Sequence, residues 1–466
     1  MTDDQATWAT GCYGNDDAIT PNIDHLASTG VMIENFFCST PVCSPSRATF
    51  LTGRIASQTG VHDWIRNGNT GPDATSYLEG QLTYTDILAK HGWSCGISGK
   101  WHLGNSELPQ HGFSHWFTHE KGGGPYNNAT MVKNGRLTKV PGYVTTAITD
   151  DAIKFITDCV NSETPFYSSI HYTAPHLPWV GHPEKYMKLY DGCNFESCPQ
   201  GETHPWARNL TDSCMGDAEL VKGYFAATTA MDHDVGRIIA HLHKLGIRED
   251  TLVIFTSDNG FNLGHHGFWG KGNGTYPQNM YESSIRVPFI ISQPGSIPSG
   301  QTRRTLVSNY DLMPTLLDYL NLEHPAPDNL PGNSFVPALS TNGIDIRKAV
   351  TVYDEYGPTR MIRDLRWKYV HRYETGPDEL YDLHNDCQEK FNLAYDVQHR
   401  DRIIAMKKSL VKWFNQYSEP MFDGKTFRVT GAGQLDRITD NNYPDSKVFH
   451  SLVGPSATGR EDIVSK

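Results

Sequence analysis

The stretch "LVIFTSDNG" (252–260) decides the fold: an apolar, β-branched run is followed at once by Asp258, Asn259 and a glycine. Such a run predicts a short buried strand that ends in a polar turn. Three other stretches are also short apolar runs, and each leads into a loop rich in polar residues and glycine. They are "WSCGIS" (93–98), "FYSSIHY" (166–172) and "VPFIIS" (287–292).

Helical patterns lie between these predicted strands. Residues 20–30 place Thr20 as N-cap, Pro21 at the first helical position and Gly30 as the stop. Residues 216–246 form a long amphipathic stretch that ends at Gly246. This alternation predicts an α/β fold with a doubly wound, mostly parallel sheet. In such sheets, functional sites form at the carboxyl ends of the strands.

The sequence pattern changes near residue 345, from alternating strands and helices to short antiparallel strands, so we expect two domains. Residues 1–345 would form the larger α/β domain. Residues 346–466 would form a smaller α+β subdomain with short antiparallel strands, a helix around 400–419 and a loop-like tail from about residue 420.

Composition excludes several classes of function. The chain has 466 residues, a net charge of −12 and 38% hydrophobic residues. This acidic balance argues against nucleic-acid binding, and an anionic substrate would have to be attracted by a local basic cluster. No apolar stretch is long enough to cross a membrane, so no membrane partner is expected. Nine cysteines are too few for a fold built on disulfides. Cys193, Cys198 and Cys214 share one loop-like stretch and could be disulfide-linked or unpaired thiols.

Carboxylates occur in pairs at two places. Asp3 and Asp4 are adjacent, and Asp258 and Asn259 follow the strand that opened this section. Carboxylate and amide oxygens that converge at strand ends suit a hard divalent cation such as Ca²⁺ or Mg²⁺. Taken singly, each pair also fits a solvated surface pair or an ordinary turn.

Basic residues and histidines follow predicted strands in three segments. Lys100 and His102 come after the first, His171 and His176 come after the second, and Lys271 lies in a glycine-rich loop. Together they predict a cationic pocket for a tetrahedral oxyanion ester, whereas a single loop lysine or histidine is usually only solvated.

A cysteine lies in the stretch "TPVCSPSRATFLTGR" (40–54). Ser44 and Pro45 suit the first turn of a helix, and Arg47 would lie near Cys43 on that turn. A helix N-terminus favours anions, so a nucleophile there is chemically sensible. The residues alone leave four readings open for Cys43: packing, half of a disulfide, a thiolate nucleophile, or the precursor of a modified residue.

These motifs together resemble the type I sulfatases of the alkaline phosphatase-like superfamily. "CSPSRATFLTGR" matches the family's first signature, and "GWSCGISGKWHLG" resembles its second, with Trp93 and Cys95 where Tyr and Thr are usual. The resemblance covers nearly the whole chain. Further matching stretches, in the family's order, are "DDQ", "GCYGN", "APHLP", "SDNG", "LGHHGFWGKG", "YESSIRVPFIISQPG", "MIRDLRWKYV" and "ELYDLHNDCQEKFNLA".

The resemblance implies that Cys43 is oxidised by a formylglycine-generating enzyme to formylglycine, an aldehyde that hydrates to a geminal diol. One diol oxygen would attack sulfur, and the second hydroxyl would later expel sulfate. The resemblance also implies a bound divalent metal, with Ca²⁺ favoured over Mg²⁺. Its ligands would be Asp3, Asp4, Asp258, Asn259 and the modified Cys43.

The family's catalytic roles also carry over residue by residue. Arg47 would hold the diol, and Lys100 and Lys271 would clamp the sulfate. His102 resembles the base that assists sulfate elimination, and His176 resembles the general acid near the leaving oxygen. We interpret His171 as structural.

The expected substrate is a sulfated glycan or oligosaccharide. Specificity should lie in loops 62–71, 119–128, 190–215 and 272–282. Trp64 and Trp179 could stack on a sugar, and His62, Arg66 and Asn279 could bind hydroxyls or a second anion. Ordinary loop packing is the competing interpretation for each. The alternative activities are an arylsulfatase and a phosphate or phosphonate monoester hydrolase. An inactive glycan-binding protein is the alternative if Cys43 stays a thiol.

In this family an apolar strand precedes the two aspartates, whereas here only Met1 and Thr2 do. We therefore expect the beginning to be truncated rather than the sheet to lack a central strand. The compartment stays open between periplasmic, secreted and cytoplasmic.

Overall fold

A computed structural model describes residues 1–323, 329–374, 376–441 and 446–451. The four predicted strands all form, and they belong to two sheets of the larger α/β part. One sheet has the strand order β5-β4-β3-β2-β6 and the other has the order β11-β1-β10-β7. Their strands are β1 (Val31–Phe37), β2 (Ser94–Gly99), β3 (Phe113–His119), β4 (Thr130–Lys133), β5 (Arg136–Lys139), β6 (Phe166–His171), β7 (Val253–Thr256), β10 (Phe289–Ser292) and β11 (Gln301–Ser308).

The first residues of the chain join these two sheets. The Met1 amine donates a hydrogen bond to the Ile170 carbonyl of β6 at 2.8 Å. Thr2 donates from its backbone N–H to the Thr256 carbonyl of β7 at 2.9 Å and pairs in parallel with Ser257. Met1 and Thr2 therefore lie as a short strand between β6 and β7, and Asp3 follows at the carboxyl edge of the sheet.

The sheet is mostly parallel, as predicted, with local exceptions. β2 pairs in parallel with β3 and β6, and β1 pairs in parallel with β11. β10 runs antiparallel to both of its neighbours. Between β7 and β10 the chain forms only short elements, and its α-helix there is α9 (Glu282–Ile285), so no long crossover helix joins these two strands. At the outer edge, β4 and β5 are also antiparallel.

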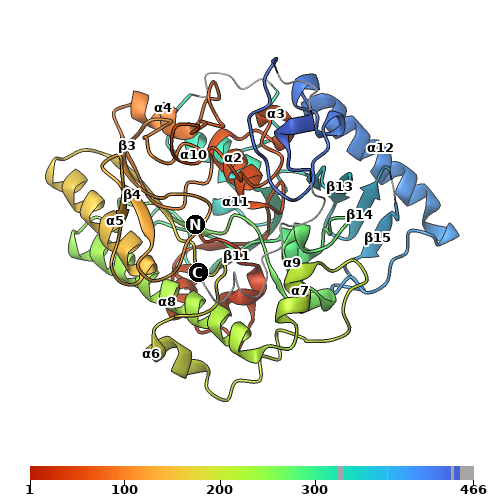
Figure 1. The fold of residues 1–466 in the computed structure, drawn as a ribbon, viewed down its shortest axis with the longest axis horizontal. Coiled ribbons are helices and arrows are strands. Elements are labelled where there is room, and N and C mark those ends of the chain that lie inside the picture. Colours follow the sequence, from red (N-terminus) through yellow and green to blue (C-terminus); the bar gives the residue numbers. More distant parts are fainter. Residues whose placement is uncertain (324–328, 375, 442–445, 452–466) are drawn as a thin grey trace.

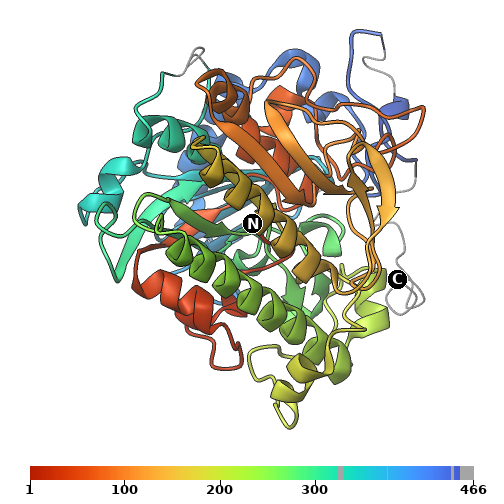
Figure 2. The same cartoon turned by 90° about the vertical axis from the view of Figure 1, so that its left-hand side faces the viewer.

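Helices cover both faces of this sheet. On one face pack α1 (Pro21–Ser28), α5 (Val144–Asn161) and α8 (Ala218–Lys244), the last two lying across the sheet in Figure 2. On the other face pack α2 (Cys43–Thr52), α4 (Tyr84–Lys90) and α10 (Leu312–Tyr319). These layers confirm the doubly wound architecture.

The start of α1 differs from the sequence prediction. Thr20 occupies the N-cap position, but its hydroxyl makes no capping bond. Asp232 of α8 instead accepts the backbone N–H groups of Asn22 and Ile23, at 3.0 and 2.8 Å. A carboxylate from a neighbouring helix thus satisfies the free donors of the first turn.

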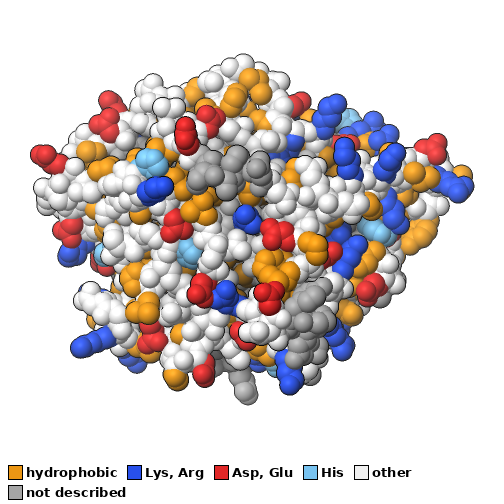
Figure 3. Space-filling view, turned by 90° about the horizontal axis from the view of Figure 1, so that it is seen from above, with side chains coloured by type: hydrophobic (Ala, Val, Ile, Leu, Met, Phe, Trp, Pro, Cys, Tyr) orange, Lys and Arg blue, Asp and Glu red, His pale blue; other side chains and the backbone are white. Residues whose placement is uncertain are grey.

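The C-terminal part forms a further sheet, separate from the two sheets of the α/β part and visible at the right of Figure 1. β12 (Val350–Asp354), β13 (Thr359–Arg363), β14 (Trp367–Arg372) and β15 (Glu379–Asp382) pair antiparallel in chain order. α12 (Arg400–Tyr417) packs on this sheet through Leu410 and Phe414. Basic side chains gather at the corresponding end of the molecule, whereas both signs of charge are interspersed over the rest of this face (Figure 3).

In the described part of the segment after α12, the elements are the single-turn 3-10 helices η8 (Pro420–Phe422), η9 (Gly424–Thr426) and η10 (Ser446–Val448), and the segment is packed against the rest of the molecule. Gln434 is fully buried and its side chain donates to the Gly60 carbonyl at 2.9 Å. The Gln434 carbonyl accepts the backbone N–H of Arg66 at 2.9 Å. Among the described residues, no helix has the length and apolar character needed to cross a membrane.

Candidate active site

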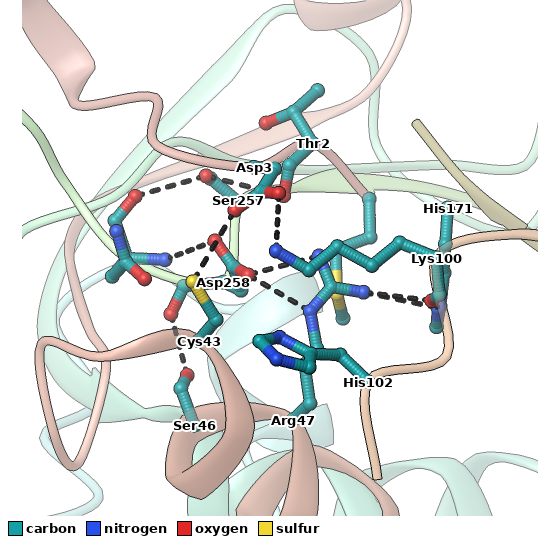
Figure 4. Close-up of polar contacts among 12 residues, drawn as sticks. Thr2, Asp3, Cys43, Ser46, Arg47, Lys100, His102, His171, Ser257 and Asp258 are labelled. Atoms are coloured by element: carbon teal, nitrogen blue, oxygen red, sulfur yellow. Dashed lines mark hydrogen bonds and ion pairs between the residues drawn. The ribbon is translucent and has the colours of Figure 1, made fainter. Parts of the chain in front are cut away.

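Cys43 is the first residue of α2 and is only 3% exposed. Ser44 donates from its hydroxyl to the His102 carbonyl at 2.9 Å, and Ser46 donates to the Asp258 carbonyl at 2.5 Å. The short polar side chains of the motif therefore fix the first turn of the helix to two loops of the sheet edge. Figure 4 shows the Cys43 sulfur between this turn and the carboxylates above it.

The two carboxylate pairs converge on this sulfur. Ligand atoms of Asp3, Cys43 and Asp258 all lie within 4.8 Å of one another. Asn259 donates from its side-chain amide to Asp4 Oδ1 at 2.7 Å. The side-chain oxygen of Asn259 is buried and accepts no bond from any described residue. The structure thus brings together all five residues that the sequence predicts as metal ligands.

Three cationic side chains surround the carboxylates. Lys100 donates to Asp3 Oδ2 at 2.5 Å, and both groups are fully buried. Arg47 donates from Nε to Asp258 Oδ2 at 2.9 Å, and its Nη2 lies 2.8 Å from the same oxygen as an ion pair without a hydrogen bond. Arg47 also donates from Nη1 to the Lys100 carbonyl at 3.0 Å, so the guanidinium is held between the two segments.

Lys271 completes the ring of charges around Cys43. Its ammonium donates to Asp4 Oδ1 at 2.5 Å and to Cys43 Sγ at 2.8 Å. The sequence placed Lys271 after a strand of the main sheet, and this was wrong. It follows β9 (Trp269–Gly270), which pairs antiparallel with β8 (Asn262–Leu263) in a separate two-stranded sheet.

Burial opposes ionisation of the acidic groups of the site, whereas the neighbouring positive charges favour it. Burial raises the pKa of the Cys43 thiol to about 12, although Lys100 and Lys271 act against it. Burial also raises the pKa of Asp258. For Asp3, burial opposes ionisation, but the charges of Lys100, His176 and Arg47 outweigh it and lower the pKa. The site is therefore an array of buried charges held by their partners.

The predicted histidines take different places. His102 donates from Nε2 to the Ile65 carbonyl at 3.0 Å, and its buried Nδ1 has no partner among the described residues. Burial, then the charge of Lys100, holds the pKa of His102 well below its usual range. His176 Nε2 lies 3.6 Å from Asp4 Oδ2. Both rings thus belong to the site.

His171 lies beneath the site rather than in it. Its Nδ1 is 3.0 Å from the Lys100 carbonyl, and its Nε2 is 2.7 Å from the Ser169 hydroxyl. Both nitrogens are engaged by structural partners, which agrees with the interpretation of His171 as structural.

Two members of the site are partly exposed. The side chains of Lys271 and His176 are 11% and 22% exposed, whereas those of Lys100 and Asp258 are fully buried. Lys271 and His176 are therefore nearer to solvent than Lys100 and Asp258.

Comparisons with known proteins agree with this geometry. A family model described as sulfatase matches residues 1–322. The chain belongs to the sulfatase family. A second family model, described as the C-terminal part of N-sulphoglucosamine sulphohydrolase, matches residues 264–416. The protein is thus a sulfuric ester hydrolase, and its family implies a formylglycine and a divalent metal.

Individual relatives of this sulfatase span most of its length. An N-acetylglucosamine-6-O-sulfatase of Bacteroides thetaiotaomicron is 27% identical, covering 90% of this chain and 86% of the relative. An uncharacterized sulfatase, YidJ, of Escherichia coli is 30% identical, covering 90% and 87%. A solved structure of a protein in complex with its substrate D-glucosamine-2-N,6-O-disulfate is 26% identical with a TM-score of 0.77, covering 90% of this chain and 97% of that one.

The residues present in this sulfatase fit a hard divalent cation. The donor set consists of carboxylates and an amide oxygen, which is the chemistry that Ca²⁺ and Mg²⁺ prefer. The orphaned side-chain oxygen of Asn259 supports this fit, because a buried acceptor without a partner is costly unless a ligand completes it.

Three of the five residues predicted to bind substrate are occupied elsewhere. His62 is 1% exposed and its Nε2 lies 2.8 Å from the Phe422 carbonyl. Trp179 is 1% exposed within an apolar cluster, so no face of its ring is left for a sugar. Asn279 is 2% exposed and donates to the Lys271 carbonyl at 3.1 Å. We assign none of these three to substrate.

Trp64 and Arg66 are the two that reach the surface. Trp64 is half-buried and Arg66 is exposed. The Arg66 guanidinium lies 5.6 Å from the centre of the Trp64 ring and donates to the Ala432 carbonyl at 2.9 Å. The packed segment after α12 therefore holds both side chains.

The three cysteines of the loop-like stretch form no disulfide. Among the described residues, which include all nine cysteines, none is linked. Cys198 and Cys214 are buried, and the Cys193 thiol donates to Asp17 Oδ1 at 3.5 Å.

The sequence analysis placed His119 and the glycines that follow it in the predicted specificity loop 119–128, but it gave none of them an individual role. His119 ends β3 beside the site, but β3 was not among the predicted strands, so no strand-end argument applied to it. The available signal was the run of three glycines inside loop 119–128.

Proposed function

We propose that this sulfatase removes O-sulfate groups from a sugar of a glycan or oligosaccharide, with Cys43 converted to formylglycine and Ca²⁺ in the carboxylate site. One observation carries the proposal. The Cys43 sulfur lies 2.8 Å from the Lys271 ammonium and 3.6 Å from Asp3 Oδ1, within a fully assembled set of acidic and basic side chains.

The ligands of the cation would be Asp3, Asp4, Asp258, Asn259 and the modified side chain at position 43. When bound there, the cation supplies positive charge that favours an ionised nucleophile and offsets charge on sulfate oxygens. Ca²⁺ fits better than Mg²⁺, because a site of many protein oxygens with no small, strict octahedron suits the larger ion.

Charge balance supports a singly charged ester. Three carboxylates, Asp3, Asp4 and Asp258, cancel three cations, Arg47, Lys100 and Lys271. A divalent cation would leave two positive charges in a buried site. A sulfate monoester and one ionised hydroxyl nucleophile bring two negative charges and restore neutrality, which buried sites favour.

We assign the basic side chains by their positions. Lys271 and Lys100 would hold sulfate oxygens. Arg47, whose guanidinium is fixed on Asp258, would orient the hydroxyl at position 43. None of these groups has to move far, and preorganised charges of this kind act strongly in a site closed to water.

The two site histidines would handle protons. His176 is partly exposed, so it would donate a proton to the leaving oxygen. His102 is buried and has a free Nδ1, so it would accept a proton from the hydroxyl at position 43 when sulfate is expelled. Cys43 is matured in this proposal by a formylglycine-generating enzyme.

The names of the relatives make a 6-O-sulfated hexosamine the first substrate to test. The experiment compares kcat/KM on 6-O-sulfated glucosamine and N-acetylglucosamine, an aryl sulfate, choline sulfate and matched phosphate monoesters, with Cys43→Ala as the blank. We expect efficient turnover of a sulfated sugar. Efficient turnover of aryl or choline sulfate with inert sugars would contradict the substrate, and faster turnover of the phosphates would contradict the ester class.

A further inference from the structure

Three consecutive glycines lie against histidines of the active site. They belong to the loop that follows β3, at residues 122–124. A methyl group added at Gly122 would lie 2.3 Å from the His102 ring, so only glycine fits there. A methyl group at Gly123 would lie 3.9 Å from the His176 ring, which is ordinary van der Waals contact. The loop therefore borders both proton-handling rings.

A third histidine, His119, lies against this loop. A methyl group at Gly124 would lie 3.5 Å from its Nδ1. β2 and β3 pair in parallel as far as Gly99 and Thr118, so Lys100, which follows β2, and His119, which ends β3, lie at the same edge of the sheet. After burial, the charge of Lys100 is the largest cause that lowers the pKa of His119. His119 therefore lies at the edge that carries a lysine that we assign to the sulfate.

The His119 ring is buried without a bonding partner. It is 1% exposed, and neither Nδ1 nor Nε2 has a partner among the described residues. Buried polar groups are nearly always paired, and leaving one unpaired costs free energy. Two orphaned nitrogens on one buried ring beside the active site therefore indicate a group that arrives with the substrate.

We propose that residues 122–124 form one wall of the leaving-group pocket and that His119 hydrogen-bonds a hydroxyl of the sugar that is released. This inference rests on the proposed function, because it names how the same site binds the sugar. The wall lies against His176, whose side chain is 22% exposed. Glycines leave that side free of side chains, and the three are half-buried rather than covered.

The chemistry of His119 matches a hydroxyl better than an anion. Burial, then the charge of Lys100, lowers the pKa of His119 to about 3, so the ring is neutral. A neutral imidazole offers one N–H donor and one acceptor nitrogen, and a hydroxyl also donates and accepts. Sites built to bind a hydroxyl reject analogues that lack it, because the polar group is then left unpaired.

The test compares two substrates in each variant. His119→Ala is assayed on 6-O-sulfated glucosamine and on 4-nitrophenyl sulfate, which has no sugar hydroxyl. We expect the ratio of kcat/KM, sugar over aryl, to fall by about 10- to 100-fold. Lys121→Ala is the matched control, since that side chain is 61% exposed in the same loop, and it should leave the ratio unchanged. An equal loss on both substrates with His119→Ala would overturn the role of His119.

Variants of the three glycines test the wall without replacing the buried His119 side chain. Gly124→Ala places a methyl beside His119 and should lower the same ratio. Gly122→Ala displaces His102 and should lower kcat on both substrates, whereas Gly123→Ala should mainly raise KM for the larger alcohol. Equal kinetics for Gly122→Ala and Gly123→Ala would overturn the wall.

Failure of the proposed substrate is separable from failure of this inference. If the wild-type enzyme cleaves aryl sulfates but no sulfated sugar, the proposed function fails. The wall is then tested with 4-nitrophenyl sulfate against the larger 4-methylumbelliferyl sulfate. Gly123→Ala should discriminate against the larger ester, and loss of both esters alike would overturn the wall.

Discussion

The Lys271 ammonium lies 2.8 Å from Cys43 Sγ and 2.5 Å from Asp4 Oδ1, so one cation joins the cysteine to the Asp4 carboxylate. Lys100 makes the corresponding contact with Asp3 from the other side, at 2.5 Å, but is fully buried. The two lysines therefore have similar proposed roles and different structural costs.

We expect Lys100→Met and Lys271→Met to differ in stability but not in activity. Each should lower kcat by about 100- to 1,000-fold, as loss of a preorganised charge-stabilising donor does. Lys100→Met leaves Asp3 buried and unpaired, which should cost about 3–5 kcal/mol of the free energy of unfolding. Lys271→Met leaves Asp4 with its hydrogen bond from the Asn259 amide, so this replacement should cost less. Urea denaturation of both variants checks this, and equal losses of stability would contradict it.

Position 43 should be essential for turnover and dispensable for the fold. Cys43→Ala removes the precursor of the nucleophile, so activity should fall to background while the thermal midpoint stays close to that of the wild type. Peptide mass spectrometry of the wild type should show formylglycine in the peptide that contains residue 43. Activity that persists in Cys43→Ala would refute the mechanism.

Metal removal should abolish activity and lower stability together. A chelator leaves the ligand oxygens, including the buried side-chain oxygen of Asn259, without their cation, and adding Ca²⁺ back at 100 times its dissociation constant should restore about 2.7 kcal/mol. Asp258→Asn should weaken this stabilisation. Calorimetry with Ca²⁺ and Mg²⁺ in parallel measures it, and a midpoint insensitive to either ion would contradict the site.

Asp63 predicts a pH dependence of stability that is separate from catalysis. Burial raises the pKa of Asp63 to about 7, from about 4 in an unfolded chain. The folded state thus binds an extra proton between these values. This contribution is complete below about pH 4 and is lost as the pH rises through 7, at no more than about 1.4 kcal/mol per pH unit.

Asp63→Asn removes this titration and can still accept one of the backbone bonds, such as that from Trp64 at 2.8 Å. Denaturation of both proteins from pH 4 to pH 8 should show the advantage of the wild type shrinking as the pH rises. Asp311, with a pKa raised to about 6 by burial, is present in both and cancels. Parallel stability curves would rule out Asp63 as the source.

Most of the fold could be predicted from the sequence because its signals are local. The strand that ends at Thr256 and the turn at Asp258 read correctly, since a buried β-branched run needs no tertiary information. The direction of β10 could not be predicted, because it depends on how the preceding loop crosses the sheet edge. The cap of α1 failed for the same reason, since Asp232 comes from a distant helix.

The central acidic and basic residues of the candidate site could be predicted, whereas the loop side chains around them could not. The strand-end positions suggested the carboxylate pairs and the basic residues, and the resemblance to sulfatases implied the full ligand set. Whether a loop side chain faces a pocket is a property of packing that spacing does not contain. Trp179 therefore looked like a sugar platform and lies in an apolar cluster, while His119 was only one residue of a predicted specificity loop and ends β3 as a buried ring.

Because Cys43 is buried in the folded protein, its conversion to formylglycine would have to occur before folding is complete. In the folded protein the sulfur is 3% exposed, and one of the groups that enclose it, Lys271, lies 228 residues further along the chain. At a synthesis rate of about 5–20 residues per second, roughly 10–45 seconds pass before that residue is made. A maturation enzyme that reads residues 43–47 as an extended peptide would have to act within this interval. Faster synthesis or earlier folding would then yield more unconverted, inactive protein.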